Sequence, residues 1–241
     1  MDVGALDAEN PNHLIIWLDQ HIGQPEWCQH LKRAFSTQTD PKTSVAVNLS
    51  DCDLGIIRHV ESAFPINFDG VCYSMAVFTD IDSCLHCFEH NKHRRIIFIT
   101  SETLGKVVVP IILERFKDMF IDPVTKEPYM FIYIFCHNIA NQVEWALDYR
   151  DYVQMFDFDA DLLARVLRDI GNYYFTEGRR LLGESPPNNV AAYHRLHWAR
   201  ILYQRHSQME QVSMSHEFDE ISHLLENIEE ELRSSSNDDD D

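Results

Sequence analysis

Glycine is scarce in this chain, with 8 in 241 residues, and no GxGxxG motif stands among them. The stretch Thr100 to Lys106 follows a predicted strand but lacks the first glycine of a phosphate-binding loop. Basic residues are also few, because 20 Lys and Arg stand against 39 Asp and Glu and leave a net charge of −19. Such a charge repels phosphate backbones and anionic lipids, so we expect no nucleic acid partner and no membrane partner.

Long apolar runs are absent, since none approaches the roughly 20 residues of a membrane-spanning helix. The first dozen residues lack the basic and apolar regions of a signal peptide. The six cysteines are too few and too scattered to form a disulfide framework. We therefore expect a cytoplasmic protein with reduced cysteines and no bound cofactor.

What is present is enough apolar sequence, 45% of the chain, to bury a sizeable core. Runs rich in β-branched and aromatic residues alternate with amphipathic stretches between residues 13 and 157, which is typical of helices covering a parallel sheet. This pattern predicts an α/β fold, with a doubly wound, mostly parallel sheet of five or six strands like that of receiver or flavodoxin domains. The predicted strands are 13–18, 73–78, 95–100, 131–136 and 152–156, and the predicted helices lie near 81–91, 103–117 and 139–149.

Residues 44–64 allow two interpretations. Residues 44–49 can form a second strand, followed by a helix holding Ile56, Ile57, Val60 and Phe64, or the segment is an insertion. With a strand, Asp80 falls at the phospho-acceptor position of a receiver domain and Thr100 at its hydroxyl position. With an insertion, the central strand ends in Thr100 and the acceptor is missing. Gln20 also replaces one metal-binding carboxylate, and no Lys stands beside Cys136.

After residue 158 the hydrophobic period becomes purely helical. We expect a disordered N-terminus (1–12), a receiver-like domain (13–158), a helical extension made of a hairpin and a terminal helix (159–233), and an acidic disordered tail (234–241). Twelve Asp or Glu and one Arg lie in residues 207–241. The terminal helix carries an apolar stripe that predicts a partner-binding or self-association surface, or packing on the chain's own hairpin: Phe218, Ile221, Leu225, Ile228 and Leu232. Ser235 and Ser236 precede aspartates and are candidate phosphorylation sites.

Open α/β sheets bind ligands at the carboxyl ends of their strands, so the candidate site lies there. Its residues are Asp19, Gln20, Asp80, Thr100, Ser101, Cys136 and His137. Cys136 suggests a thiol nucleophile, but adjacent strand residues point to opposite faces, so His137 is poorly placed as its base and a structural cysteine is expected.

Four residues with metal-binding side chains repeat every third position in one predicted helix. They are Cys84, Cys87, His90 and His93. This ladder turns about 60° around the axis per step, so its members diverge and we expect no metal site.

Three segments, IIWLDQHIG, RRIIFITSETLGKVVVP and FIYIFCHN, together resemble an uncharacterised receiver-like or TIR-like α/β domain. That domain is found N-terminal to tetratricopeptide repeats of the kinesin-light-chain kind or to ADP-ribosyltransferase domains. The resemblance covers residues 13–157 and brings no catalytic residues with it. The helices after residue 160 are weakly similar to one tetratricopeptide unit, with Ile170, Gly171 and Tyr174 matching its first helix.

Two functional classes follow. The favoured one is a non-enzymatic protein-interaction or signalling module with a degenerate receiver-like domain. The alternative is an enzyme, either a TIR-like hydrolase of NAD or another nucleotide or a phospho-accepting receiver. A TIR-type hydrolase needs a pocket glutamate, for which Glu102 and Glu144 are the available candidates.

Overall fold

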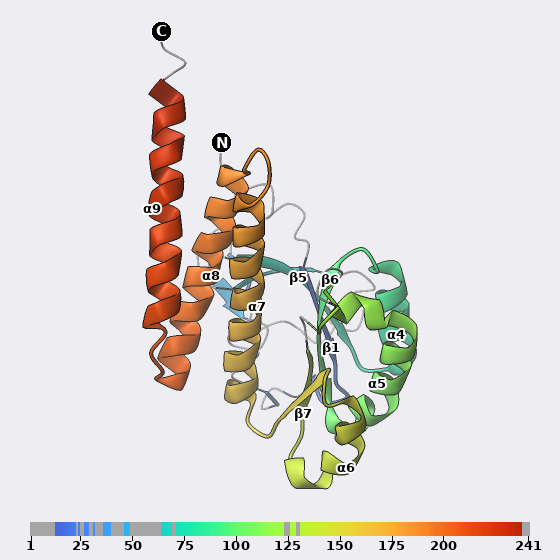
Figure 1. Cartoon of the computed structure of the whole chain (residues 1–241). Helices are drawn as coiled ribbons and strands as arrows, with labels where there is room; N and C mark the ends of the chain where they lie inside the picture. The colour runs from blue at the N-terminus through green and yellow to red at the C-terminus, as the bar shows by residue number, and fades with distance from the viewer. Residues whose placement is uncertain are drawn as a thin grey trace. The chain divides into compact units, whose positions relative to one another are not determined.

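The computed structural model describes residues 13–22, 24, 27–28, 31, 36–39, 46–48, 64–68, 71–122, 126–128 and 131–237 (Figure 1). Two compact units divide the chain between Leu163 and Ala164, within one helix. The first unit contains a β-sheet with its helices, and the second is helical. No described helix combines the length and the apolar character that a bilayer crossing requires.

Eight described strands form one sheet in the order β3-β2-β4-β5-β1-β6-β7-β8. They are β1 (His13–Leu18), β2 (Ser36–Thr39), β3 (Ala46–Asn48), β4 (Phe64–Phe68), β5 (Val71–Phe78), β6 (Arg95–Ser101), β7 (Ile132–Phe135) and β8 (Val153–Phe156). Strands β5, β1, β6, β7 and β8 are parallel, whereas β4, β2 and β3 extend the sheet in antiparallel fashion. The α/β class with a parallel sheet is therefore as predicted, while the strand count exceeds the predicted five or six.

The five parallel strands, numbered along the chain, have the spatial order 2-1-3-4-5, which flavodoxin-like folds share. The described strands β2, β3 and β4 are inserted in the sequence between the first two of them. Strand β3 lies within the predicted strand 44–49, but it pairs antiparallel with β2 and is not part of the parallel set. Phe64, which the strand-and-helix interpretation placed in a helix, begins β4 instead, and its helical partners in that interpretation lie outside the described residues.

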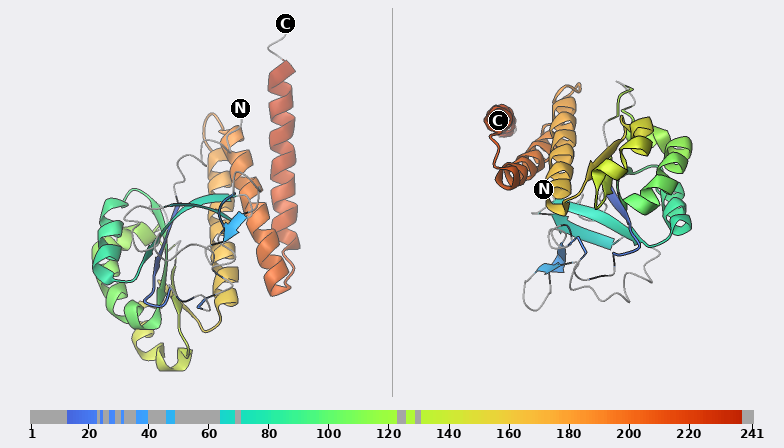
Figure 2. Two further views of the ribbon diagram at one scale, coloured as in Figure 1. Left: turned by 180° about the vertical axis from the view of Figure 1, so that it is seen from behind. Right: turned by 90° about the horizontal axis from the view of Figure 1, so that it is seen from below.

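Helices α4 (Ile81–His90) and α5 (Glu102–Phe116) pack side by side on one face of the parallel strands (Figures 1 and 2). Helix α4 connects β5 to β6 and α5 connects β6 to β7, so both connections move across the sheet in the same direction. Right-handed crossovers therefore place both helices on the same face. Phe88 of α4 shows how tightly they pack, because its ring lies 5.5 Å from Phe116 of α5 and 5.3 Å from Phe98 of β6.

The predicted helix 139–149 is instead a succession of short turns. They are η3 (Ile139–Asn141), α6 (Val143–Ala146) and η4 (Leu147–Tyr149). The Asn138 side chain accepts a hydrogen bond from the Ala140 amide and opens η3, a tight turn that Gln142 then ends. Between α5 and β7 lie η2 (Lys117–Phe120) and a bridge between Ile121 and Pro128.

The second unit contains most of α7 (Asp159–Leu182), together with α8 (Asn189–Glu210) and α9 (Ser215–Asn237). Helices α7 and α8 approach closely at two glycines of α7. A Cβ on Gly171 would lie 2.7 Å from the Tyr203 ring, and one on Gly178 would lie 2.8 Å from Leu196. The Tyr203 hydroxyl donates to Asn172 at 2.7 Å, and His206 Nδ1 donates to the Ala164 carbonyl at 2.9 Å.

The apolar stripe of α9 is not open to a partner along most of its length. Ile221, Leu225 and Ile228 are buried and Phe218 is half-buried, since α9 packs against α8. Only Leu232, at the far end, is exposed. The structure therefore places the stripe on the chain's own helices, which is the second of the two arrangements that the sequence allowed. Ser235 and Ser236 fall in the last turns of α9, and their side chains lie outside the description.

We expect Gly171→Ala to destabilise the protein. The new methyl group would collide with a Tyr203 ring that is held by Asn172, and overpacking of this kind costs about 1–3 kcal/mol. This outweighs the helix-propensity gain of about 1 kcal/mol. Urea unfolding should show a lower midpoint. The control is Gly183→Ala, whose Cβ would meet nothing closer than 3.4 Å, and an equal loss in both variants would contradict close packing at Gly171.

Candidate functional site

Asp19 follows β1, which lies between β5 and β6 among the parallel strands. Its side chain is fully buried, although a carboxylate normally remains in water. Two donors compensate for the lost water: the His21 amide donates to Oδ1 at 2.8 Å, and the Trp27 indole Nε1 donates to Oδ2 at 2.6 Å. Its own amide donates to the Phe78 carbonyl of β5 at 2.9 Å. Asp19 therefore ties the turn after β1 to the sheet.

Trp27 fills the space beside this carboxylate. Its ring contacts His21, Phe135 and His137, with centroid distances of 5.1, 5.5 and 5.2 Å. Phe135 and His137 lie at the end of β7, so the indole connects the carboxyl ends of two strands that are not neighbours. Sequence reasoning missed the role of Trp27 as a hydrogen-bond donor. An aspartate eight residues earlier is no recognisable motif.

Thr100 and Ser101 end β6, next to β1. Thr100 pairs with Leu18 in the sheet register and is fully buried, and its hydroxyl faces the Ser101 carbonyl at 3.4 Å. Ser101 pairs with Phe135 and is the residue preceding α5. Counted along the chain, β6 is the third parallel strand, and it is also the central one. This is the strand that would carry the acceptor aspartate of a receiver domain, but it ends in the hydroxyl residues Thr100 and Ser101.

Asp80 follows β5, which is the second parallel strand along the chain and a neighbour of β1. Its Oδ1 accepts a hydrogen bond from the Ser83 amide at 2.9 Å, which caps the start of α4. The interpretation of Asp80 as an acceptor on the central strand is therefore wrong. Gln20 is exposed next to Asp19.

Cys136 is buried at the end of β7, where its thiol donates to the Phe156 carbonyl at 3.5 Å. Burial raises the pKa of Cys136 to about 11, and the nearby carboxylates of Glu102 and Asp157 add to the shift. The thiol is therefore protonated near neutral pH, whereas a nucleophilic cysteine needs a lowered pKa. His137 is exposed and its ring packs on Trp27. This geometry favours the structural interpretation of Cys136.

Glu102, one of the two candidate hydrolase glutamates, begins α5. Its Oε2 atom is buried and forms no hydrogen bond with any residue that the structure describes. The other candidate, Glu144, is exposed on α6. The structure thus brings Glu102 near Cys136 and leaves Glu144 at the surface.

Cys84, Cys87 and His90 of the ladder diverge around α4, and His93 lies beyond the end of that helix. Cys84 is buried, Cys87 is half-buried, and His90 and His93 are exposed. Burial raises the pKa of both thiols, that of Cys87 to about 11. Within the described part of the chain, no three His, Cys, Asp or Glu side chains are grouped so that they could hold a metal ion.

The hydrogen bond between Asp19 and Trp27 should contribute measurably to stability. We expect Trp27→Phe to lower the free energy of unfolding, because it leaves a buried carboxylate with one donor fewer while an aromatic ring remains. A double-mutant cycle with Asp19→Asn should give a coupling energy of about 1.5–3 kcal/mol, as for hydrogen bonds to charged groups. Coupling below about 0.5 kcal/mol would show that the two residues act independently.

Cys136 should react slowly with iodoacetamide in the native protein. A pKa of about 11 leaves about one thiol in ten thousand ionised at pH 7, and the side chain is buried. Peptide mapping by mass spectrometry should show labelling at least about 100-fold slower than in the urea-unfolded chain. Rapid labelling of native Cys136 would restore the thiol-nucleophile hypothesis.

Comparison with protein-family models, with curated proteins and with solved structures gives no significant match to this chain. The functional argument therefore depends on the geometry of its own residues.

Proposed function

We propose that this chain is a non-enzymatic protein-interaction module, in which a degenerate receiver-like domain of flavodoxin-like topology carries a helical extension that binds a protein partner. The observation that carries the proposal is the burial of Asp19. Both its oxygens accept hydrogen bonds from the chain itself, at 2.8 Å and 2.6 Å. A carboxylate that holds a catalytic cation needs free oxygens facing solvent or phosphate.

The other strand-end groups support the same conclusion. Thr100 is buried, Cys136 is held as a thiol, and Asp80 caps a helix. Each group that phosphoryl transfer or thiol chemistry would use has a structural role.

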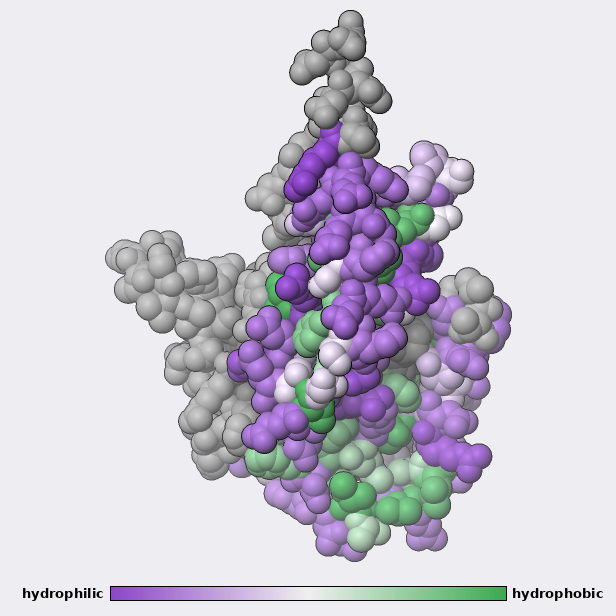
Figure 3. Space-filling model, turned by 60° about the vertical axis from the view of Figure 1, so that its left-hand side comes forward, coloured by the Kyte–Doolittle hydropathy of each residue, from purple (hydrophilic) through white to green (hydrophobic). Residues whose placement is uncertain are grey.

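The partner surface that we propose is the outer face of α9. Asp219, Glu226 and Glu230 are exposed and form no ion pair with the described residues. At 100° per residue they share one stripe, opposite the buried Ile221, Leu225 and Ile228. Figure 3 shows that the helix leading to the grey C-terminal residues is mainly hydrophilic on its visible side.

Other acidic residues of α9 serve the chain's own packing. Glu217 pairs with Arg168 at 3.2 Å and Glu220 with Arg179 at 3.3 Å, both on α7. Glu231 accepts a hydrogen bond from Asn189 of α8 at 2.7 Å. The exposed acidic stripe of Asp219, Glu226 and Glu230, here called the outer stripe, remains available to a partner, and four aspartates at 238–241 follow it in the sequence. Its negative charge favours a basic segment of the partner protein.

The test is binding with and without the outer stripe. The variant Asp219→Asn, Glu226→Gln, Glu230→Gln should lose a partner that wild-type protein retains on affinity purification. Direct titration with that purified partner should show at least about tenfold weaker binding, and the wild-type affinity should fall with added salt. The matched control, Glu114→Gln, Asp118→Asn, Asp148→Asn, removes the same charge from exposed positions elsewhere and should bind like wild type.

Equal binding by all three proteins would overturn the proposed surface. The enzyme alternative has its own readout in the wild-type protein. Acetyl phosphate with Mg²⁺ should add no base-labile phosphoryl group to Asp80, and incubation with NAD should release no nicotinamide. Either product would overturn the non-enzymatic proposal in favour of an enzyme. If nicotinamide is released, Glu102 is the first residue to substitute.

A further inference from the structure

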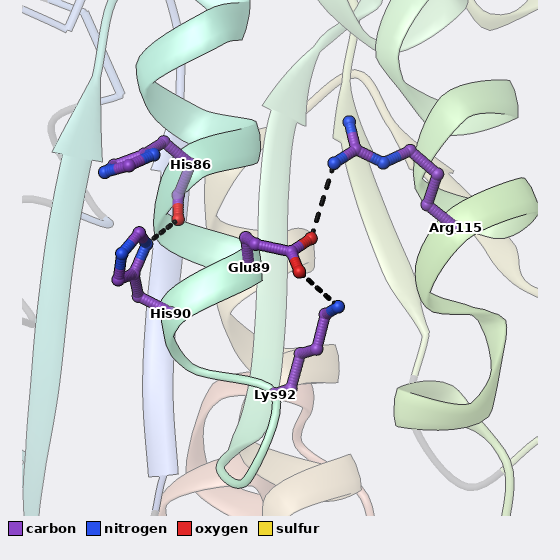
Figure 4. Close-up of polar contacts among 5 residues, drawn as sticks. All are labelled: His86, Glu89, His90, Lys92 and Arg115. Carbon is purple, nitrogen blue, oxygen red and sulfur yellow. Dashed lines mark hydrogen bonds and ion pairs between the residues drawn. The ribbon is translucent and has the colours of Figure 1, made fainter.

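Two histidines on α4 stand outside every role described so far. His86 and His90 lie four residues apart, one helical turn, and both are exposed. Their ring centroids are 4.1 Å apart, with an angle of 52° between the planes. Figure 4 shows both rings extending from the same side of the helix.

The orientation of His90 is fixed by a hydrogen bond. Its Nδ1 donates to the His86 carbonyl at 2.8 Å, so in the neutral ring Nε2 carries the free lone pair. Metal-binding histidines commonly donate their second nitrogen to a backbone carbonyl in this way, which orients the ring and makes it a better ligand. The His86 ring nitrogens form no hydrogen bond with the described residues, so they remain available.

The surrounding charges favour a cation at this pair. Glu89 binds Lys92, and it binds Arg115 of α5 at 3.3 Å, on the side of α4 away from the two rings (Figure 4). The Lys92 ammonium lowers the pKa of Glu89, and both basic groups are held away from the histidines. His90 lies in the last turn of α4, where the helix dipole stabilises positive charge, and Asp82 lies one turn before His86.

We propose that His86 and His90 form a labile two-ligand site for a late first-row divalent metal ion such as Zn²⁺. Imidazole suits Zn²⁺, Ni²⁺ and Cu²⁺ rather than Mg²⁺ or Ca²⁺. Since no third His, Cys, Asp or Glu joins the pair among the described residues, water completes the coordination. The ion is therefore exchangeable and is distinct from a structural zinc.

This site shares only His90 with the Cys84 to His93 ladder. Members of the ladder are three residues apart and diverge, whereas His86 and His90 share a face. Cys84 is buried and Cys87 is held as a thiol that accepts a hydrogen bond from Asn91, so neither is a competing ligand.

The experiment is Zn²⁺ titration of the full chain by isothermal calorimetry near neutral pH. The chain has 13 histidines, so the informative quantity is the loss of one binding class between variants. We expect His86→Gln and His90→Gln each to weaken the tightest class at least about tenfold, since even removing an outer-shell partner costs about 10- to 100-fold. Both residues are exposed, so the variants should keep the wild-type circular dichroism spectrum.

Two controls make the result decisive. His93→Gln removes an exposed histidine three residues beyond His90, and Cys87→Ser removes the half-buried thiol; both should leave the isotherm unchanged. In NMR spectra, substoichiometric Zn²⁺ should shift the imidazole signals that are missing from the His86 and His90 variants. An unchanged isotherm in His86→Gln and His90→Gln, or an equal loss in either control, would overturn the site.

Discussion

A carboxylate buried at the end of β1 is the constraint on which the carboxyl edge of this sheet depends. Asp19 cannot remain charged and buried without donors, and two of them come from the following segment: the His21 amide and the Trp27 indole. Placing the indole there also places its ring against Phe135 and His137. This one hydrogen-bonded carboxylate thus holds Trp27 against the end of β7, at the edge of the sheet where α/β proteins usually bind ligands.

Other residues at this edge of the sheet also have polar partners within the chain. The edge is built from groups that satisfy one another: a carboxylate with an indole, a thiol with a carbonyl, a hydroxyl with the adjacent carbonyl. Such an edge stabilises a scaffold. In the proposed module, recognition uses a surface that the core does not need, the outer face of α9.

The sequence predicted the parallel strands well, because each is a short buried run flanked by amphipathic segments. It failed where the information is not local. The insertion between β1 and β5 pairs antiparallel with the sheet edge, and the run 44–49 looks the same in either direction. The stripe of α9 was recognised as apolar, but whether it meets α8 or a partner depends on contacts such as Arg168 with Glu217, 49 residues apart. Likewise, no spacing rule connects Asp19 to Trp27.

The division between the two units falls inside α7, and this has a consequence for how the chain can change over evolutionary time. Domains are commonly exchanged as whole pieces through linkers, where a cut leaves both parts with complete elements. Here Leu162 and Leu163 are buried in one unit, and Val166 and Leu167, one turn later, are buried in the other. A recombination event at the boundary would split a hydrogen-bonded helix, so the sheet and the three helices are expected to be inherited together.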